Sequence, residues 1–560
     1  MKPETAKPRA LTGQARHFCT FLSITNGRLR NLTCRTQSEM LPSMAEVKFQ
    51  DYALRLREND NVAVAKRFLK AGVELSQGSL RFTVARDVAP GHKLALAELP
   101  EGAPVIKYGQ VIGFARGRIA PGDHVHTHNL AMKDFGRDYH FCEDARPVDC
   151  YPAEQQRYFQ GYARPNGRVG TRNYLAVISS VNCSASVSNY VRDRFKGPEF
   201  QHDFPNVDGV IAFTHKSGCA IQPGDPHRLL QRVLAGIARH PNIGGYVMIG
   251  LGCEVNQIQF IIKDYKLDEP RAGELAPAFM TIQSAGGIRK TVEAGVEAVK
   301  KLLPAANAAR RAPQPISKLI LAENCGGSDG NSGITANPAL GVASDELVRH
   351  GGTSVLAETP EIYGAEHLLT RRAITREVGE KLVSFIHWWE DHVRQFNATI
   401  DNNPTYGNKE GGLSTIYEKS LGAVAKGGQS PLAAVYAYAE EIKSPGLCFM
   451  DTPGFDPVSM TGLVAGGCNI GVFTTGRGSV YGCKPAPCIK VATNTPLFLH
   501  MNDDMDINAG TILDGSETVE QVGRRIFEKI IAVAGGEKTR SELAGIGDEE
   551  FAPWQLGPTF

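Results

Sequence analysis

Residues 174–183 read YLAVISSVNC, a run of β-favouring apolar residues that ends in a short polar loop with an asparagine and a cysteine. Two later segments repeat the pattern, GVIAF at 209–213 and GYVMIG at 245–250, and stretches with helical spacing separate them. Apolar strands that alternate with helices are typical of a parallel sheet, because a parallel connection needs a long crossover. The sequence therefore predicts an α/β domain over residues 155–305.

A second series of apolar strands follows this domain. It comprises residues 318–321, 353–356, 446–450, 470–473 and 489–492. The Ala-, Pro- and Arg-rich segment 304–317 and the polar segment 143–160 look like linkers. We therefore predict a two-part region with mainly parallel α/β sheets, whose second part covers residues 316–556.

The amino-terminal part of the chain has a different pattern. Residues 45–135 contain short strands with Gly/Pro turns, such as 80–84, 104–108 and 111–114, and one expected helix at about 62–69. This pattern predicts a small β-rich domain. The first 43 residues carry seven basic and two acidic side chains and no sustained hydrophobic period. We interpret residues 1–44 as a disordered or non-native extension and expect Met44 to be the functional start.

The composition narrows the class of protein. Lys and Arg (61) nearly balance Asp and Glu (59) over 560 residues, so nothing favours nucleic acid or an anionic membrane as the main partner. No apolar run approaches the roughly 18 residues of a membrane-spanning helix. Twelve cysteines are too dilute for a disulfide scaffold. We expect a cytoplasmic protein that binds a small molecule.

Polar or glycine-rich loops follow nearly every predicted strand. The carboxyl ends of parallel strands form the ligand crevice of an open α/β sheet, so these loops predict an active site. None of them matches a P-loop or the dinucleotide fingerprint. Their backbone amides can instead hold a carboxylate or sugar hydroxyls, and Arg477 offers a bidentate fork for a carboxylate.

The segment GDHVHTHN at 122–129 has a histidine at every second position. In an extended chain His124, His126 and His128 share one face, and two of them can reach one metal ion. A solvated polar strand is the alternative. We expect a metal site, with His126 and His128 as the first ligand choices and His124 next.

Four cysteines each follow a predicted strand: Cys183, Cys219, Cys253 and Cys325. Three thiolates around an iron–sulfur cluster with one open iron would suit a hydroxy-acid dehydratase. Small buried thiols in tight loops are the alternative reading. We keep Cys219, Cys253 and Cys325 as an alternative ligand set for iron.

Over residues 45–556 the sequence resembles the altronate dehydratase and galactarate dehydratase family of sugar-acid hydro-lyases. The matching blocks include GDHVHTHN (122–129), HKSGC (215–219), GLGCE (250–254), CGGSDGNSGITANPALG (325–341), ETPEIYGAEHLL (358–369), GNKEGGLSTIYEKSLG (407–422) and FTTGRGSVYG (473–482). The resemblance implies that residues 45–135 form a β-clip (SAF-like) domain and that the remainder is the catalytic region. It also implies dehydration of an aldonic or aldaric acid to a 2-keto-3-deoxy acid, and it makes iron the expected cofactor.

The chemistry of dehydration assigns roles to the matching residues. Removing a proton from C2 needs a base, and expelling hydroxide from C3 needs an acid or a Lewis acid. Lys409 is our candidate base, and Glu358, Glu361 and His215 are rival acid–base groups. We expect substrate binding by Arg477, Ser328, Asp329, Asn408 and Thr475. Mononuclear Fe²⁺ on the histidines is favoured over a cluster, because a cluster would leave the histidine strand unused.

The sequence does not select one substrate from several related acids. The triple-histidine strand resembles the altronate branch, whereas MDINAG (505–510) is at least as similar to galactarate dehydratases, and a sulfolactate-eliminating branch shares the architecture. D-altronate is our first expectation, and galactarate or sulfolactate is the alternative. A homo-oligomer is compatible with the sequence. A carbohydrate-binding protein without catalysis is the non-enzyme alternative.

Overall fold

A computed structural model describes residues 46–77, 80–133, 136–137, 139–269 and 275–559, together with two short strands near the amino terminus. The chain divides into two compact units, Met1–Ala45 and Glu46–Phe560. In the first unit, β1 (Ile24–Thr25) and β2 (Arg28–Leu29) form an antiparallel pair. The remaining residues of the predicted extension lie outside the described part.

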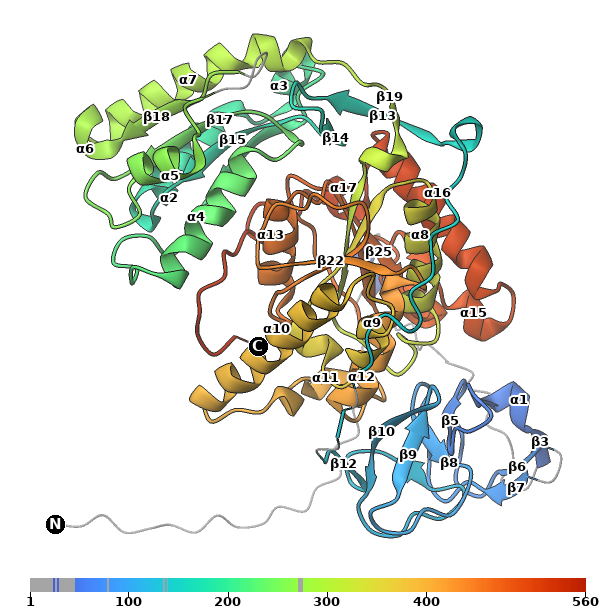
Figure 1. Cartoon of the computed structure of the whole chain (residues 1–560). Coiled ribbons are helices and arrows are strands. Elements are labelled where there is room, and N and C mark those ends of the chain that lie inside the picture. Colours follow the sequence, from blue (N-terminus) through green and yellow to red (C-terminus); the bar gives the residue numbers. More distant parts are fainter. Residues whose placement is uncertain are drawn as a thin grey trace. The chain divides into compact units, whose positions relative to one another are not determined.

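The β-rich domain contains three small sheets (Figure 1). One has the order β3-β6-β7, the second β11-β8-β5-β4 and the third β12-β10-β9. Their bounds are β3 (Glu46–Lys48), β4 (Ala53–Leu54), β5 (Val62–Ala65), β6 (Glu74–Gln77), β7 (Leu80–Thr83), β8 (Lys93–Ala95), β9 (Pro104–Lys107), β10 (Gln110–Ala115), β11 (His124–Val125) and β12 (Leu130–Ala131), with the one-turn helix α1 (Phe49–Tyr52). The SAF-like β domain of the prediction is thus present.

The helix predicted at about residues 62–69 is wrong. Val62–Ala65 is strand β5, which lies between β4 and β8 with all four residues buried. Small and β-branched side chains on both faces suit a strand that is covered on both sides. Pairing with two neighbouring strands outweighs the helical spacing of this short segment.

The two predicted linkers pair with each other. Strand β13 (Tyr158–Ala163) is antiparallel to β19 (Ala312–Pro315), with Tyr158 opposite Pro315, and β14 (Val169–Gly170) flanks β13 on its other side. Helix α7 (Ile288–Ala308) runs through Pro304, where the sequence suggested that the second linker begins. Both connections of the middle domain therefore lie side by side.

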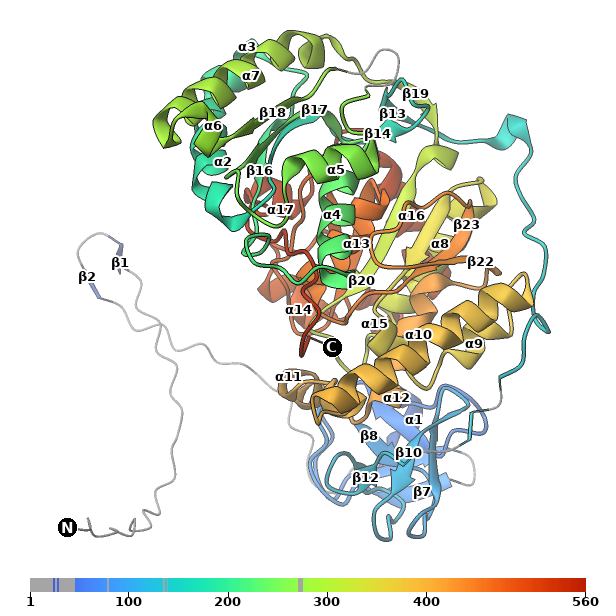
Figure 2. The same ribbon diagram turned by 60° about the vertical axis from the view of Figure 1, so that its left-hand side comes forward.

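The middle domain is a four-stranded parallel sheet of order β16-β15-β17-β18. Along β15, Leu175 and Val177 face α2 and α7, whereas Ala176 and Ile178 face α4 and α5. Successive side chains of a strand point to opposite faces, so an apolar run is covered on both sides (Figure 2). The elements are β15 (Tyr174–Ser179), β16 (Gly209–Phe213), β17 (Ile243–Gly250), β18 (Ala278–Thr281), α2 (Ala185–Arg192), α3 (Pro198–Asp203), α4 (Asp225–Ala238), α5 (Ile258–Tyr265) and α6 (Ile282–Ala285).

The last domain is a seven-stranded parallel sheet of order β22-β23-β21-β20-β24-β25-β26. Helices α8 (Ala336–Arg349) and α16 (Val519–Ala534) cover one face, and α13 (Asp456–Gly466) covers part of the other. The strands are β20 (Ile320–Cys325), β21 (Thr353–Leu356), β22 (Leu432–Tyr436), β23 (Gly446–Met450), β24 (Ile470–Thr475), β25 (Cys488–Ala492) and β26 (Ile507–Asn508). The predicted α/β fold class is confirmed.

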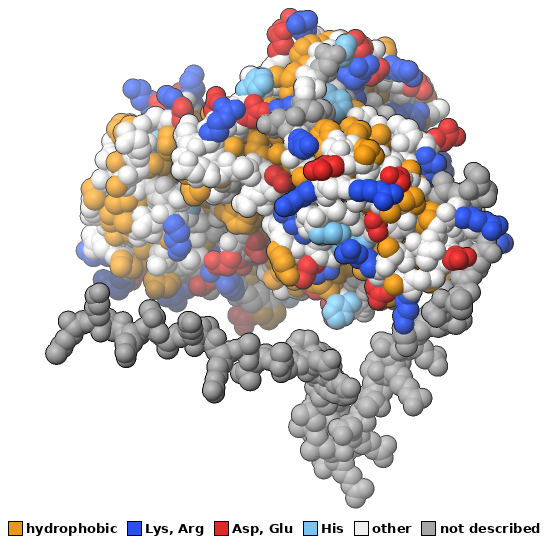
Figure 3. All heavy atoms as spheres, turned by 90° about the horizontal axis from the view of Figure 1, so that it is seen from below, with side chains coloured by type: hydrophobic (Ala, Val, Ile, Leu, Met, Phe, Trp, Pro, Cys, Tyr) orange, Lys and Arg blue, Asp and Glu red, His pale blue; other side chains and the backbone are white. Residues whose placement is uncertain are grey.

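Further helices complete this domain. They are α9 (His367–Thr370), α10 (Arg376–Gln395), α11 (Tyr406–Glu410), α12 (Ile416–Val424), α14 (Thr495–His500), α15 (Thr511–Asp514) and α17 (Arg540–Leu543). Among the described residues, none of the helices combines the length and the apolar character that a membrane span requires. On the face shown in Figure 3, basic and acidic side chains of the described residues are interspersed, in keeping with the near balance of charges.

Candidate active site

The strand order of the seven-stranded sheet indicates where a ligand crevice is expected. The first strand, β20, has β21 on one side and β24 on the other, so the chain changes direction across the sheet at this point. A crevice opens outside the carboxyl ends of strands at such a switch point. The loops after β20 and β24 meet there, because the amides of Gly476 and Arg477 donate to the Gly327 oxygen at 3.0 and 2.7 Å.

Asp329 is held beside these loops by several hydrogen bonds. Its carboxylate accepts hydrogen bonds from the Thr493 and Ser332 hydroxyls, both at 3.0 Å, and from the Asn331 amide at 3.1 Å. Burial raises its pKa. Within the described structure, Ser328 Oγ and Asn331 Oδ1 are buried without a hydrogen-bond partner. Such atoms indicate where a ligand hydroxyl or carboxylate can bind.

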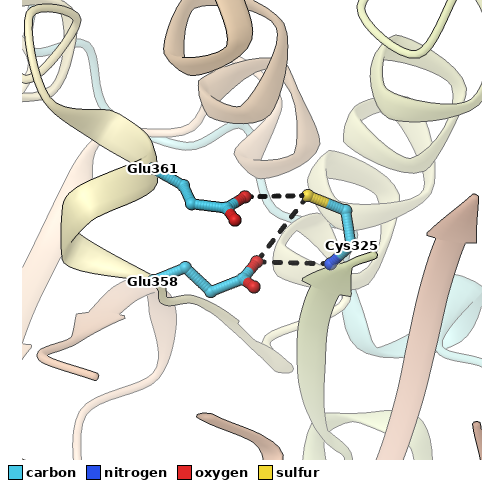
Figure 4. Close-up of side chains that lie close together, drawn as sticks. All are labelled: Cys325, Glu358 and Glu361. Carbon is cyan, nitrogen blue, oxygen red and sulfur yellow. Dashed lines mark hydrogen bonds between the residues drawn. The ribbon is translucent and has the colours of Figure 1, made fainter. Parts of the chain in front are cut away.

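A buried cluster of charged groups lies at the ends of β20 and β21. Cys325 ends β20, and Glu358 and Glu361 follow β21 (Figure 4). The Cys325 thiol donates to Glu361 Oε2 at 3.4 Å and to Glu358 Oε2 at 3.7 Å, and the Cys325 amide lies 3.2 Å from the latter oxygen. Glu358 has φ = +68°, a left-handed conformation that costs energy for a residue other than glycine.

Two lysines neutralise the cluster. The Lys426 ammonium is 3.0 Å from both Cys325 Sγ and Glu358 Oε2, and Lys419 bonds Glu361 Oε1 at 2.5 Å. All of these side chains are buried. Burial of a charge is tolerated only with such compensation, so the cluster is a preorganised set of paired charges.

The carboxyl groups of Glu358, Glu361 and Asp456 have different environments, which shift their pKa values in different directions. Burial and the neighbouring Glu361 raise the pKa of Glu358 to about 7. Burial acts on Glu361 too, but Lys419 and Lys426 outweigh it and hold the pKa of Glu361 below its usual value. Burial, followed by Glu358 and Glu361, raises the pKa of Asp456 well above its usual value. Carboxyl groups with such divided pKa values can act as base and acid near neutral pH.

The β domain contributes to the same region through a buried triad. Glu418 on α12 accepts from Lys93 and Lys107, both at 2.8 Å, and the three side chains are at most 1% exposed. Although burial acts in the opposite direction, Lys107 and Lys93 lower the pKa of Glu418 to about 2. The triad fixes the β domain against the last domain.

The histidine segment is only partly a strand. Strand β11 ends at Val125, and residues 126–129 form a turn in which Asn129 Oδ1 accepts from the His126 amide at 2.9 Å. The imidazoles nevertheless gather, with ring centroids 5.4 Å apart for His124 and His126 and 5.5 Å apart for His124 and His128. The expected extended register over all three histidines is wrong, because the chain must turn to reach β12.

A fourth histidine joins this group. His92, which precedes β8, has Nδ1 3.0 Å from Nε2 of His124. Burial, followed by the neighbouring histidines, lowers the pKa of His124 to about 3, and burial and Lys93 lower that of His126 to about 4. Burial lowers the pKa values of His92 and His128 as well. The rings are therefore neutral near pH 7, which is the form that binds metal.

Helix α11 connects the histidines to the crevice. The Lys409 and Glu410 carbonyl oxygens lie 2.9 and 3.0 Å from Nε2 of His126 and His92. The Asn408 amide donates to the Ser328 oxygen at 2.8 Å, and the half-exposed Arg477 lies 3.4 Å from Glu410 Oε2. Thr475 is buried and accepts from the Gly478 amide at 3.0 Å. The structure thus brings together the predicted substrate-binding residues and places the histidines beside them.

Other predicted site residues lie in the middle domain. His215 follows β16, where its Nε2 lies 3.0 Å from the Ser179 oxygen, and burial lowers its pKa to about 4. Cys219 and Cys253 follow β16 and β17 of the four-stranded sheet, whereas Cys325 is buried in the seven-stranded sheet. Among the described residues, Cys219, Cys253 and Cys325 do not gather within 4.8 Å of one another. Strand-end position alone does not say which sheet a strand joins.

A cavity of 420 Å³ lies elsewhere in the described structure. Residues 163–166 and 238–246 line it at the amino end of β17, opposite the loops that follow the strands. Its lining combines alanine, proline and glycine with charged side chains such as Arg164, Arg239 and Glu269, and we assign it no chemistry.

Similarity to known proteins extends over most of the second unit, Glu46–Phe560. Residues 316–559 match the family described as D-galactarate/Altronate dehydratase, C-terminal. Residues 161–307 match its second domain and residues 51–133 its SAF domain. The chain belongs to the D-galactarate/altronate dehydratase family.

Characterised members of the D-galactarate/altronate dehydratase family are similar over most of their length. An altronate dehydratase of Escherichia coli (strain K12) is 36% identical over 87% of this chain and 96% of its own. An altronate dehydratase of Bacillus subtilis (strain 168) is 36% identical over 90% and 99%. A galactarate dehydratase (L-threo-forming) of Escherichia coli (strain K12) is 36% identical over 89% and 96%. Equal identities do not select one substrate.

Several residues of the dehydratase site escaped the sequence prediction. They are His92, Lys93, Lys107, Glu418, Lys419, Lys426 and Asp456. One signal was available: α12 is apolar around most of its circumference, so Glu418 and Lys419 had to be buried with partners. His92 could not be found, because only the pairing of β8 with β11 brings it to His124.

Proposed function

We propose that the protein dehydrates a sugar acid, with D-altronate as the substrate, to a 2-keto-3-deoxy sugar acid. Membership of the dehydratase family supports the reaction class. The observation that carries the proposal is the buried cluster of Cys325, Glu358 and Glu361, which two lysines neutralise beside a crevice lined by Asp329 and Arg477. A non-catalytic carbohydrate-binding protein would have no use for buried carboxyl groups with divided pKa values.

The charges around the crevice favour a substrate with one carboxylate. Arg477 offers a guanidinium for that carboxylate, but Glu410 lies against it at 3.4 Å. Lys419 and Lys426 are already paired with glutamates. A second carboxylate, as in galactarate, would approach Asp329 and Glu410 without a free cation among these groups. Altronate has one carboxylate and therefore fits better.

Glu358 is our choice of base for the C2 proton. Its Oε2 accepts from Lys426 and from the Cys325 amide, while its buried Oε1 has no hydrogen-bond partner in the described structure. The pKa of about 7 suits proton abstraction near neutral pH. Burial raises the pKa of Asp401 and the nearby Lys409 acts in the opposite direction, so the Lys409 side chain lies beside Asp401. We therefore prefer Glu358 to Lys409.

The neighbouring groups supply the remaining chemistry. The ammonium groups of Lys426 and Lys419 would stabilise the negative charge that develops at C1 and C2. Burial raises the pKa of Asp456 well above its usual value and so favours its protonated form, which can give a proton to the departing C3 hydroxyl. Its carboxyl group lies close to Gly326, where an added Cβ would be 2.2 Å from Asp456 Oδ2.

Two sets of side chains are candidates for the iron expected of the family. The donor atoms of Cys325, Glu358 and Glu361 lie within 4.8 Å of one another, but Lys426 and Lys419 already provide the counter-charge, so this set does not suit a dication. The histidine group suits one better. His92 Nδ1 lies 3.0 Å from His124 Nε2. Two nitrogens that bind one metal at right angles, each with a bond of about 2.1 Å, are separated by the same distance.

We therefore propose His92 and His124 as the principal iron ligands. His126 and His128 stand beside them, although both ring nitrogens of His126 already have partners in Thr127 and the Lys409 oxygen. Bound Fe²⁺ would act as a Lewis acid towards a substrate hydroxyl or carboxylate. The low pKa values of the histidines keep their lone pairs available for it.

The decisive experiment is a substrate panel. Protein purified anaerobically and supplied with Fe²⁺ is assayed for 2-keto acid with altronate, galactarate, glucarate and sulfolactate. We expect the highest kcat/KM with altronate. Preference for galactarate would overturn the argument from charge, and absence of keto product from every sugar acid would overturn the proposed reaction.

A further inference from the structure

Three cysteines of the middle domain follow three adjacent strands. Cys183 follows β15, Cys219 follows β16 and Cys253 follows β17, and the strand order is β16-β15-β17. The chain reverses its direction across the sheet at β15, so the three loops surround a switch point of their own. All three thiols are exposed. The roles proposed above for the last domain leave them unused.

Hydrogen bonds tie the three loops to one another. The Asn182 amide donates to the Ser217 oxygen at 2.9 Å, which joins the first loop to the second. The Val255 amide donates to the Cys219 oxygen at 3.1 Å, which joins the third loop to the second. The Asn256 side chain donates to the Ser180 oxygen at 2.8 Å and closes the ring. The three cysteine backbones are thus positioned before any ligand binds.

A buried carboxylate and two glycines stiffen this arrangement. Glu254 accepts from the Ser180 hydroxyl at 2.9 Å and from the Gly252 amide at 2.5 Å. Gly218 has φ = +99°, and a Cβ there would lie 2.6 Å from the Ser180 oxygen. Gly250 approaches Glu254 with similar closeness. Such close packing around exposed thiols is typical of a site built for a ligand.

The sulfur atoms have the surroundings of metal-bound thiolates. The Gln283 side-chain amide donates to Cys253 Sγ at 3.2 Å, and hydrogen bonds to sulfur are a means of tuning iron–sulfur centres. The Cys183 side chain interacts with those of Cys219 and Cys253, so the three sulfurs lie near one another.

We propose that Cys183, Cys219 and Cys253 bind a [4Fe–4S] cluster and leave one iron without a protein thiolate. A single zinc ion fits less well. Zinc–sulfur bonds of about 2.3 Å place tetrahedral thiolates about 3.8 Å apart. Among the described residues, the three sulfurs are not gathered within 4.8 Å of one another. A cluster spreads its ligands over several irons and suits the wider spacing.

The test measures sulfide rather than turnover. The full chain is purified anaerobically, reconstituted with Fe²⁺ and sulfide, and analysed for iron, acid-labile sulfide, visible absorption and the electron paramagnetic resonance signal after reduction. We expect about four sulfides per chain. The triple variant Cys183→Ser, Cys219→Ser, Cys253→Ser should lose the sulfide by 10-fold or more, in line with the cost of disturbing metal-site groups. Cys150→Ser, at an exposed cysteine outside these loops, should keep it.

A milder variant keeps the proposal testable if the triple variant does not fold. Gln283→Leu removes the hydrogen bond to Cys253 and should shift the reduction potential while retaining the cluster. The proposal is overturned if the reconstituted wild-type protein holds no acid-labile sulfide. It is also overturned if the sulfide survives in the folded triple variant, or if the three thiols hold one zinc ion instead. Iron on the histidines carries no sulfide, so the two sites are distinguished.

Discussion

The ammonium nitrogen of Lys426 lies 3.0 Å from Oε2 of Glu358, and both side chains are fully buried. The pair is needed because the backbone buries the Glu358 carboxylate. Glu358 adopts a left-handed backbone at the end of β21, which turns its carboxylate towards β20 instead of solvent. Lys426, two residues after the end of α12, supplies the compensating charge. The pair is therefore at once a structural tie and a means of holding a carboxylate in a dry site.

Glu358→Gln should abolish most turnover while preserving the fold. The amide keeps the size of the side chain but cannot take the C2 proton, so keto acid formation should fall by roughly 10²- to 10⁴-fold. Steady-state assays with altronate measure the change. Glu377→Gln, on the exposed start of α10, is the matched control. Turnover within twofold of wild type in Glu358→Gln would remove Glu358 from the base role.

The pH dependence of kcat/KM should report the same group. A base works when it is deprotonated, and the pKa of Glu358 is raised to about 7. Activity should therefore rise with pH through about 7 and level off above it. If the base were a carboxylate with an ordinary pKa of 4.5, kcat/KM would not change with pH until the pH fell to about 5. A flat profile between pH 5 and 8 would contradict the assignment.

Lys426→Met should destabilise the protein strongly. It leaves Glu358 buried without its cation, and breaking a buried pair typically costs about 3–5 kcal/mol of unfolding free energy. Adding Glu358→Gln in the same chain should restore part of the loss, because the unpaired charge is then gone. Urea unfolding measures both effects. Lys381→Met, at a half-exposed position on α10, should change the unfolding free energy little.

Glu418 should make stability depend on acid pH. Its folded pKa is lowered from 4.5 to about 2, so its contribution is present above pH 4.5 and is lost as the pH falls from 4.5 towards 2. The loss should be on the order of 3 kcal/mol. Glu418→Gln should reduce the stability at pH 7 and flatten this part of the profile. Glu549→Gln, at an exposed position, should leave the profile unchanged.

Replacement of His92 or His124 by alanine should reduce, by about 10-fold or more, the iron of anaerobically purified protein that exceeds its acid-labile sulfide. The direct metal analysis does not depend on activity. His202→Ala, at an exposed histidine of the middle domain, is the control. If His126→Ala and His128→Ala empty the site while His92→Ala does not, the ligand set expected from the sequence is the better one.

Local pattern was enough to predict the parallel sheets. The strands around residues 174–178, 209–213 and 245–250 are buried on both faces, and an apolar run is the direct mark of that condition. The same reasoning failed at Val62–Ala65, where pairing with β4 and β8 decides the structure. Short segments carry too little pattern to reveal which neighbours they will have.

The sequence predicted those site residues that follow strand ends. It missed those that reach the site only through contacts between distant segments of the chain. Asp329, Glu358 and Arg477 all follow strands that meet at one edge, so their grouping was predictable. His92 and Lys426 reach the site through contacts with residues 32 and 68 positions away. The sequence grouped Cys325 with Cys219 and Cys253, but the structure does not gather them, since the grouping depends on which sheet each strand joins. No local pattern contains that information.

The pairing of β13 with β19 places the beginning and the end of the middle domain next to each other, with Tyr158 opposite Pro315. A segment with adjacent ends can be inserted into or removed from a gene without separating the parts that flank it. The middle domain is thus a cassette in the topological sense. Its cysteine-bearing loops can diverge, or be exchanged between homologues, while the sheet that carries Glu358 keeps its own connections.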